Sequence, residues 1–132
     1  MIERILIIGL GSIGKRHLQI VRELMPIADI RVLSHSKCKE IPGIANGCFS
    51  SIEEMNDFSP QLAVVANPAP FHISIAMDLV NLGCHLLIEK PISINANRIM
   101  ELIDAARKNN VLIQLGYNLR FHLSLEYFRN LI

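Results

Sequence analysis

The chain has 132 residues, of which 51% are hydrophobic and 19% are charged. This size and composition support one folded core and exclude a disordered chain. The formal net charge is only +1, and no dense Lys/Arg stripe with interleaved aromatic residues occurs, so binding to nucleic acid or to an anionic membrane is not expected. The expected partners are small molecules or protein surfaces.

Cysteine usage and the first residues favour a cytoplasmic protein. Cys38, Cys48 and Cys84 are odd in number and lack CxxC or Cys/His spacing, which argues against a disulfide framework and against a zinc site. We therefore expect no disulfide, no bound metal and a reducing compartment. The start, MIERILIIG, has charges in its first four residues and an uninterrupted apolar run of only four residues before Gly9, too short for a signal peptide or a membrane span.

Strand-like apolar runs and helix-like periodic segments alternate along the chain. In the first part of the chain we expect a strand at 4–9, a helix at 13–24 and a strand at 29–33, and then a mostly irregular stretch at 34–50 with room for a short strand near Ile44. A short helix ending at Met55, a strand at 61–67 and a helix at 71–82 are expected next. The last elements are a strand at 85–90, a helix that begins at Asn95, a strand at 111–118 and a helix that begins at Phe121. This β-α-β order predicts an α/β fold with a doubly wound parallel sheet, whose ligands bind at the carboxyl ends of the strands.

The segment GLGSIG, at residues 9–14, follows the first strand and opens the first helix. Gly9, Gly11 and Gly14 match GxGxxG, in which the glycines allow the tight turn, the approach of a pyrophosphate and close helix packing. The free amides of Ser12, Ile13 and Gly14 would then face the phosphates. The segment predicts a Rossmann-type dinucleotide-binding domain; the alternative is a glycine-rich turn without a ligand.

The segment after the second strand concerns the choice between NAD and NADP. An acidic residue that would bind the adenine ribose of NAD is missing there, and the chain instead offers Ser34, Ser36 and Lys37. Hydroxyl and ammonium donors suit a ribose 2′-phosphate, so the sequence favours NADP over NAD. The alternative is a loop whose polar groups are only solvated.

Three further stretches follow strands and are expected near the same site. NPAPFH offers Asn67, Pro68 and His72, either as cofactor contacts or as a rigid connector. The second stretch is EKP, at Glu89, Lys90 and Pro91, and the third is GYNLRF, with Asn118 and Arg120. Taken alone, a Glu-Lys pair is more often a surface ion pair and an Arg a solvated charge.

Together, GLGSIGKRH, NPAPFH, LIEKP and GYNLRF span nearly the whole chain. They resemble the N-terminal domain of the glucose-fructose oxidoreductase, inositol dehydrogenase and rhizopine-catabolism (Gfo/Idh/MocA) family, and LIEKP is the most specific of the four. The departures are Asn67, where Thr or Ser is frequent in the family, and the non-acidic SHSK segment. The resemblance implies oxidation or reduction of a sugar, polyol or sugar nucleotide with a nicotinamide cofactor, NADP or NAD.

The resemblance also implies roles for the EKP residues. Lys90 would be the catalytic residue, because a lysine at the nicotinamide edge can hydrogen-bond the substrate hydroxyl and relay its proton. A lysine partly shielded from water suits this task, and Glu89 would bind the nicotinamide ribose or restrain the lysine. The Lys90–Pro91 peptide bond is expected to be cis.

Two other functions stay open from the sequence: a module that senses NAD(P) without chemistry, and a different Rossmann dehydrogenase, such as one acting on an amino-acid semialdehyde. For an oxidoreductase of the Gfo/Idh/MocA type, we expect a cofactor-binding domain at residues 1–120. Residues 121–132 would begin a linker helix to a substrate domain outside this chain. The 132-residue chain by itself would then bind cofactor without turnover. A homo-oligomer is possible, because that helix carries apolar residues at helical spacing.

Overall fold

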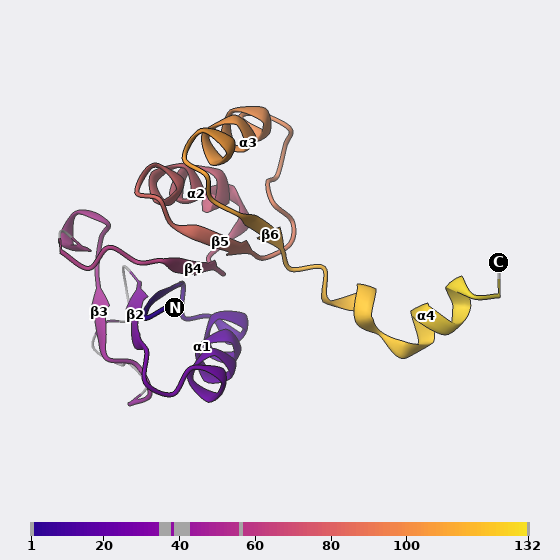
Figure 1. The fold of residues 1–132 in the computed structure, drawn as a ribbon, viewed down its shortest axis with the longest axis horizontal. Coiled ribbons are helices and arrows are strands. Elements are labelled where there is room, and N and C mark those ends of the chain that lie inside the picture. Colours follow the sequence, from indigo (N-terminus) through magenta and orange to yellow (C-terminus); the bar gives the residue numbers. More distant parts are fainter. Residues whose placement is uncertain (1, 35–37, 39–42, 56, 132) are drawn as a thin grey trace.

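A computed structural model of the chain describes residues 2–34, 38, 43–55 and 57–131. Its centre is a six-stranded sheet with the strand order β3-β2-β1-β4-β5-β6, in which all neighbouring strands run parallel (Figure 1). This order is that of a doubly wound nucleotide-binding sheet, and it reverses direction between β1 and β4. The expected α/β fold class is confirmed.

The sheet carries helices on both faces. Its strands are β1 (Arg4–Ile8), β2 (Asp29–Leu33), β3 (Gly47–Phe49), β4 (Leu62–Val65), β5 (His85–Ile88) and β6 (Ile113–Leu115). The α-helices are α1 (Ser12–Leu24), α2 (His72–Asn81), α3 (Ile99–Lys108) and α4 (Leu123–Arg129), and the 3₁₀ turns are η2 (Glu53–Met55), η3 (Ala69–Phe71) and η4 (Asn118–Phe121). Figure 1 shows α1 on one face of the sheet and α2 and α3 on the other.

The apolar run of β1 is buried because both faces of the sheet are covered. Ile5 and Ile7 pack with Leu18 of α1 in one cluster. The alternate residues of the strand, among them Leu6, pack with Leu79 of α2 in the other cluster. A strand of continuous apolar residues therefore supports two cores, and its carboxyl end is held firmly at the ligand-binding edge.

Two elements begin later than the sequence predicted. The short strand expected near Ile44 is β3, at Gly47–Phe49. Asn46 precedes it and its Oδ1 accepts hydrogen bonds from Ile30 N (2.9 Å) and Arg22 Nη2 (2.6 Å), which fixes the approach of the chain to β2.

The helix expected from Asn95 begins only at Ile99. Asn95 Oδ1 accepts a hydrogen bond from Asn97 N (2.9 Å), and Arg98 has a left-handed backbone with φ of 61°. An Asx turn followed by a left-handed residue cannot continue as a right-handed helix, so α3 starts after it.

The expectation of no disulfide is wrong in this structure. Cys38 and Cys48 form a disulfide with an S–S distance of 1.99 Å, and only Cys84 is free. Residue 38 follows β2 and residue 48 lies in β3, which pairs with β2, so the fold brings together two cysteines that are ten positions apart. Spacing along the chain does not reveal such a pairing. The cysteine count therefore gives no support for a reducing compartment.

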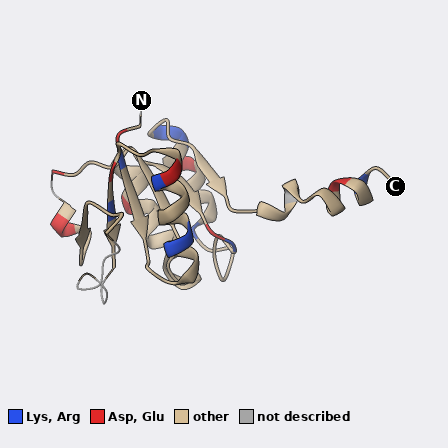
Figure 2. Ribbon diagram, turned by 90° about the horizontal axis from the view of Figure 1, so that it is seen from below, with Lys and Arg blue, Asp and Glu red and all other residues tan. Residues whose placement is uncertain are grey.

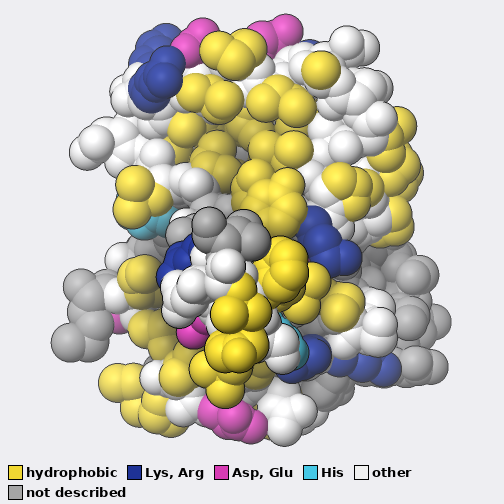
Figure 3. Space-filling view, turned by 90° about the vertical axis from the view of Figure 1, so that its right-hand side faces the viewer, with side chains coloured by type: hydrophobic (Ala, Val, Ile, Leu, Met, Phe, Trp, Pro, Cys, Tyr) yellow, Lys and Arg dark blue, Asp and Glu magenta, His cyan; other side chains and the backbone are white. Residues whose placement is uncertain are grey.

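The last helix lies apart from the sheet. Figure 1 shows η4 and α4 extending away from the body, and the view toward this end shows hydrophobic side chains on it (Figure 3). Phe121 and Leu123 are 73% and 80% exposed.

No helix among the described residues is long and apolar enough to cross a bilayer. Charged residues of both signs are scattered over the body in Figure 2 rather than gathered in one stripe.

Candidate functional site

The candidate site lies where the strand order reverses, at the carboxyl ends of β1 and β4. A hollow of about 490 Å³ has Gly9, Gly11, Ser34 and Asn67 in its lining. A second hollow of about 350 Å³ is lined by residues that include Glu89 and Lys90. The two share Ile13, Ala66 and Asn67, so they adjoin, and we call them together the edge cleft. Open parallel sheets bind their ligands at this position.

The three glycines of GLGSIG have separate structural roles. Gly9 has φ of +88°, and a Cβ on it would lie 2.9 Å from Asn67 Cα. A Cβ on Gly14 would overlap the carbonyl oxygen of Gly9, because helix and strand pack closely there. At Gly11, in contrast, a Cβ would meet nothing within 4 Å. Gly9 and Gly14 are thus required by the fold, whereas Gly11 leaves space open for a ligand.

The first turn of α1 can bind an anion. Gly11 is the N-cap residue and no side chain caps the helix. Lys15 N makes the first intrahelical hydrogen bond, to Gly11 O (3.0 Å), so the amides of Ser12, Ile13 and Gly14 have no intrahelical acceptor. Together with the positive end of the helix dipole, these amides suit a pyrophosphate group.

Asn67 supplies a polar group between the two hollows. Its Oδ1 is the one buried side-chain atom among the described residues that has no hydrogen-bond partner. Buried polar atoms normally have partners, so an unpaired atom beside an open glycine turn is the pattern expected of a ligand-binding site. The residues present therefore fit a dinucleotide.

The EKP residues follow β5, and two of them, Glu89 and Lys90, border the smaller hollow. The Lys90–Pro91 peptide bond is cis, as expected. Lys90 is exposed rather than partly shielded, which corrects the expectation of a desolvated lysine. Within the described part of the chain, its ammonium has no hydrogen bond or ion pair.

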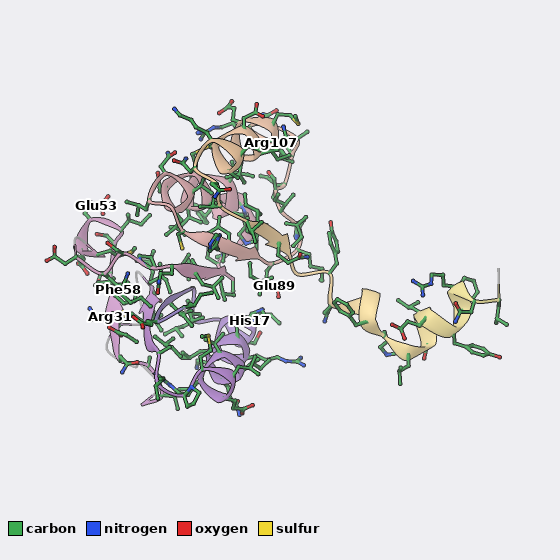
Figure 4. The ribbon with its side chains drawn as sticks, viewed as in Figure 1. His17, Arg31, Glu53, Phe58, Glu89 and Arg107 are labelled. Atoms are coloured by element: carbon green, nitrogen blue, oxygen red, sulfur yellow. A yellow bond between two sulfur atoms is a disulfide. The ribbon has the colours of Figure 1, made fainter. Side chains whose placement is uncertain are left out.

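The Glu89 carboxylate is held by the protein itself. Its Oε1 lies 2.7 Å from His17 Nε2, and its Oε2 accepts a hydrogen bond from Lys90 N (3.2 Å). Figure 4 shows His17 on α1 and Glu89 after β5 facing each other. His17 is not among the site residues expected from the sequence. The signal was available, because GKRH places this histidine one helical turn after Gly14, on the same helix that would hold the phosphates.

His72 is a connector in this structure. Its side chain is buried at 2% exposure, with Nδ1 2.9 Å from Pro91 O and Nε2 2.7 Å from Asn67 O. Each ring nitrogen thus lies within hydrogen-bond distance of a backbone carbonyl oxygen, and the tautomer decides which of the two oxygens accepts a hydrogen bond. This geometry favours the rigid-connector alternative over a direct cofactor contact.

All the site residues expected from the sequence divide into three groups by their place in the structure. Those that border the edge cleft are Gly9, Gly11, Ser12, Ile13, Ser34, Asn67, Pro68, His72, Glu89, Lys90 and Asn118. Gly14 lies buried beneath the turn, and Pro91 is joined to Lys90 at the border. Arg120 belongs to η4, and Ser36 and Lys37 lie outside the described residues. No group of three or more His, Cys, Asp or Glu side chains among the described residues could hold a metal ion.

The parallel sheet, the glycine turn and the edge cleft define a dinucleotide-binding Rossmann domain. A sequence profile of the Gfo/Idh/MocA family, described as "Oxidoreductase family, NAD-binding Rossmann fold", matches residues 3–117. The chain belongs to this family, as its four motifs indicated.

Similar proteins include sugar and polyol dehydrogenases. UDP-N-acetylglucosamine 3-dehydrogenase of Acidithiobacillus ferrooxidans is 21% identical over 93% of this chain and 39% of its own length. Myo-inositol 2-dehydrogenase of Thermotoga maritima is 25% identical over 98% of this chain and 40% of its own length. The WlbA dehydrogenase of Bordetella pertussis, solved in complex with NADH and UDP-GlcNAcA, has a TM-score of 0.88 at 18% identity and is matched over 98% of this chain and 41% of its own. The chain thus spans about two fifths of the length of these relatives.

Proposed function

We propose that the edge cleft binds a nicotinamide dinucleotide and that Lys90 serves oxidation or reduction of a substrate hydroxyl or carbonyl group. The observation that carries this proposal is an open glycine turn and an unpartnered lysine on one continuous cleft. A bound nicotinamide ring would supply the hydride chemistry. The amides of Ser12, Ile13 and Gly14 would hold the pyrophosphate, and Asn67 would offer its amide group to the ligand between the two hollows.

Lys90 would act on the substrate rather than on the fold. When a hydroxyl carbon loses hydride, its oxygen must also lose a proton. In its neutral amine form, the Lys90 Nζ at the smaller hollow could accept that proton and then release it to solvent. The Lys90 side chain is available for this role, because it has no hydrogen bond or ion pair with the described residues.

The proposed substrate is a sugar, a polyol or a sugar nucleotide. The named relatives act on compounds of these classes, but this chain covers only about two fifths of their length. We therefore propose that residues 1–120 supply the cofactor part of the site, and that residues 121–132 lead toward a separate part that binds substrate. The exposed apolar residues of η4 and α4 agree with such a linker and with a homo-oligomer contact.

Between the two cofactors, the proposal favours NADP. Ser34 follows β2 and borders the larger hollow, where a carboxylate would be expected for the ribose of NAD. Titration of the chain with NADH and NADPH, followed by their fluorescence, should give the lower Kd for NADPH. A lower Kd for NADH would overturn the preference and leave the site itself intact.

Gly11 allows a direct test of cofactor binding. A Cβ there enters the open space above the turn, so Gly11→Ala should lower NADPH and NADH affinity at least about tenfold while costing less than about 1 kcal/mol of stability. Gly43→Ala is the matched control, because a Cβ at Gly43 also meets nothing within 4 Å. Equal affinity in both variants and the unchanged chain would refute the proposed binding site.

Lys90→Ala separates an enzyme from a sensor. In a form of the protein that turns over a sugar substrate, kcat should fall at least about 100-fold while the Kd for NADPH stays within about threefold. The isolated 132-residue chain should bind cofactor without turnover on a panel of sugars and sugar nucleotides. Unchanged kcat in Lys90→Ala would favour a module that senses NAD(P) without chemistry.

A further inference from the structure

Lys90 lies between two residues that are held by histidines from opposite faces of the sheet. His17 of α1 contacts the Glu89 side chain, and His72 of α2 contacts the Pro91 carbonyl group. We propose that His17 and His72 are positioning residues that together fix the backbone of Lys90 over the edge cleft. This inference rests on the proposed role of Lys90, and neither histidine is assigned a contact with substrate or cofactor.

We call the contacts of His17 and His72 on either side of Lys90 the bracket. Its first half is the contact of His17 with Glu89. The carboxylate lies between α1 and the end of β6, with Oε1 toward His17 Nε2 (2.7 Å) and Oε2 toward the Lys90 amide (3.2 Å). Its third neighbour is Gly116, where a Cβ would lie 3.2 Å from both Cδ and Oε1. A larger residue at position 116 would therefore press against the carboxylate. His17 therefore affects the Lys90 backbone N–H indirectly, because it orients the Glu89 carboxylate that accepts a hydrogen bond from this N–H.

The second half runs through His72. This ring is almost fully buried and lies between the carbonyl oxygens of Pro91 (2.9 Å) and Asn67 (2.7 Å). It joins the turn after β4 to the turn after β5. Because both oxygens are acceptors, a ring with one N–H donates to one of them at a time. Donation to Pro91 O fixes the chain immediately after Lys90, and donation to Asn67 O fixes the residue that lies between the two hollows.

Such a bracket is needed because the Lys90 side chain cannot position itself. Its four-carbon stem is flexible, and among the described residues its ammonium has no partner. The direction in which it leaves the backbone therefore depends on residues 89 and 91. Since His17 lies on the helix whose first turn would hold the pyrophosphate, the same helix would place both the cofactor and, through Glu89, the lysine.

Conservative variants separate the contacts. His17→Gln keeps a nitrogen donor in the position of Nε2, whereas His17→Leu removes it. At position 72, Asn resembles the Nδ1 side of the ring that faces Pro91, and Gln resembles the Nε2 side that faces Asn67. We expect His17→Gln and His72→Asn to preserve the bracket, and His17→Leu and His72→Gln to break it.

The direct readout is the backbone amide of Lys90 in ¹⁵N NMR spectra of the 132-residue chain. In His17→Leu, the Lys90 amide should exchange with solvent at least about threefold faster and its resonance should shift, while β5 amides such as Leu87 keep their protection. His17→Gln should return the exchange rate to within about twofold of the unchanged chain. If Lys90 behaves alike in His17→Leu and the unchanged chain, the proposal is wrong; if β5 also loses protection, His17 is a general structural residue and the proposal is again wrong.

The His72 variants and the kinetics complete the test. His72→Gln should speed solvent exchange of the Lys90 amide more than His72→Asn does. The opposite order would contradict the assigned contact between His72 and the Pro91 carbonyl oxygen. In a form of the protein with turnover, His17→Leu should lower kcat at least about tenfold with the NADPH Kd within about threefold. Failure of the proposed function would appear differently, as unchanged turnover in Lys90→Ala with the amide effects still present.

Discussion

Arg31 and Lys90 show how differently this domain treats two cations near its surface. Arg31 of β2 makes hydrogen bonds to the Asp29 carboxylate at 3.0 to 3.2 Å. Its guanidinium also lies 4.7 Å from the ring centre of Phe58 and 5.5 Å from that of Phe49. Figure 4 shows Arg31 and Phe58 together near the β3 edge of the sheet, away from His17 and Glu89.

Lys90 also has an acidic neighbour, but that acid is engaged elsewhere. Glu89 is directed to His17 and to the Lys90 backbone, and the ammonium itself has no partner in the described part of the chain. Folding alone thus satisfies the charge of Arg31 and leaves that of Lys90 available. The comparison separates a cation that stabilises the domain from one that has no such contact among the described residues.

The largest effect on stability is expected from the glycine that supports the turn. Gly14→Ala places a Cβ against the Gly9 carbonyl oxygen and forces α1 away from β1. We expect a loss of about 2–3 kcal/mol in the free energy of unfolding, measured by urea denaturation. Gly11→Ala on the same turn is the control. A similar loss in both variants would show that the turn as a whole, rather than the contact at Gly14, limits stability.

A matched pair of substitutions tests the comparison of the cations. Arg31→Met should cost about 1 kcal/mol of stability, a value discounted for the partial exposure of the pair, because it removes the ion pair and both ring contacts. Lys90→Met should change stability by less than about 0.5 kcal/mol. Urea denaturation of both variants gives the two values. Equal costs would contradict the distinction drawn here.

A smaller effect is expected from Cys84, a buried group that is uncharged when the domain is folded. Burial raises the pKa of its thiol from 9.0 to about 12. The unfolded thiol loses its proton at lower pH than the folded one, so the folded state loses stability as the pH rises above about 9. Between about pH 8 and about pH 9.5, the chain should lose roughly 0.8 kcal/mol more than the Cys84→Ala variant does. Equal pH dependence would show that this thiol is not protected.

The elements near the cleft were the most predictable from sequence. Continuous apolar runs such as ILII in β1 and the GxGxxG turn are local signals, and they placed Gly9, Gly11 and Gly14 correctly. The cis peptide before Pro91 was expected from the family resemblance and is present. These features depend on neighbouring residues in the chain or on a specific motif.

Contacts between distant segments were less predictable. The disulfide depends on pairing of β2 with β3, and the His17–Glu89 contact joins residues 72 positions apart. The start of α3 depends on the Asx turn at Asn95, which resembles a helix cap in sequence. In each case the residue types were visible, but their partners were fixed only by the tertiary fold.

We propose that the polar groups at the edge cleft bind a dinucleotide, whereas those around Arg31 are satisfied within the domain. The most direct test is titration of the ¹⁵N-labelled chain with NADPH and with NADH, followed by amide chemical shifts. We expect both cofactors to shift the amides of residues 9–14, 67 and 89–90, with those of Asp29, Arg31 and Phe58 unchanged. Shifts centred on Arg31, or no saturable shifts at the glycine turn, would contradict the account.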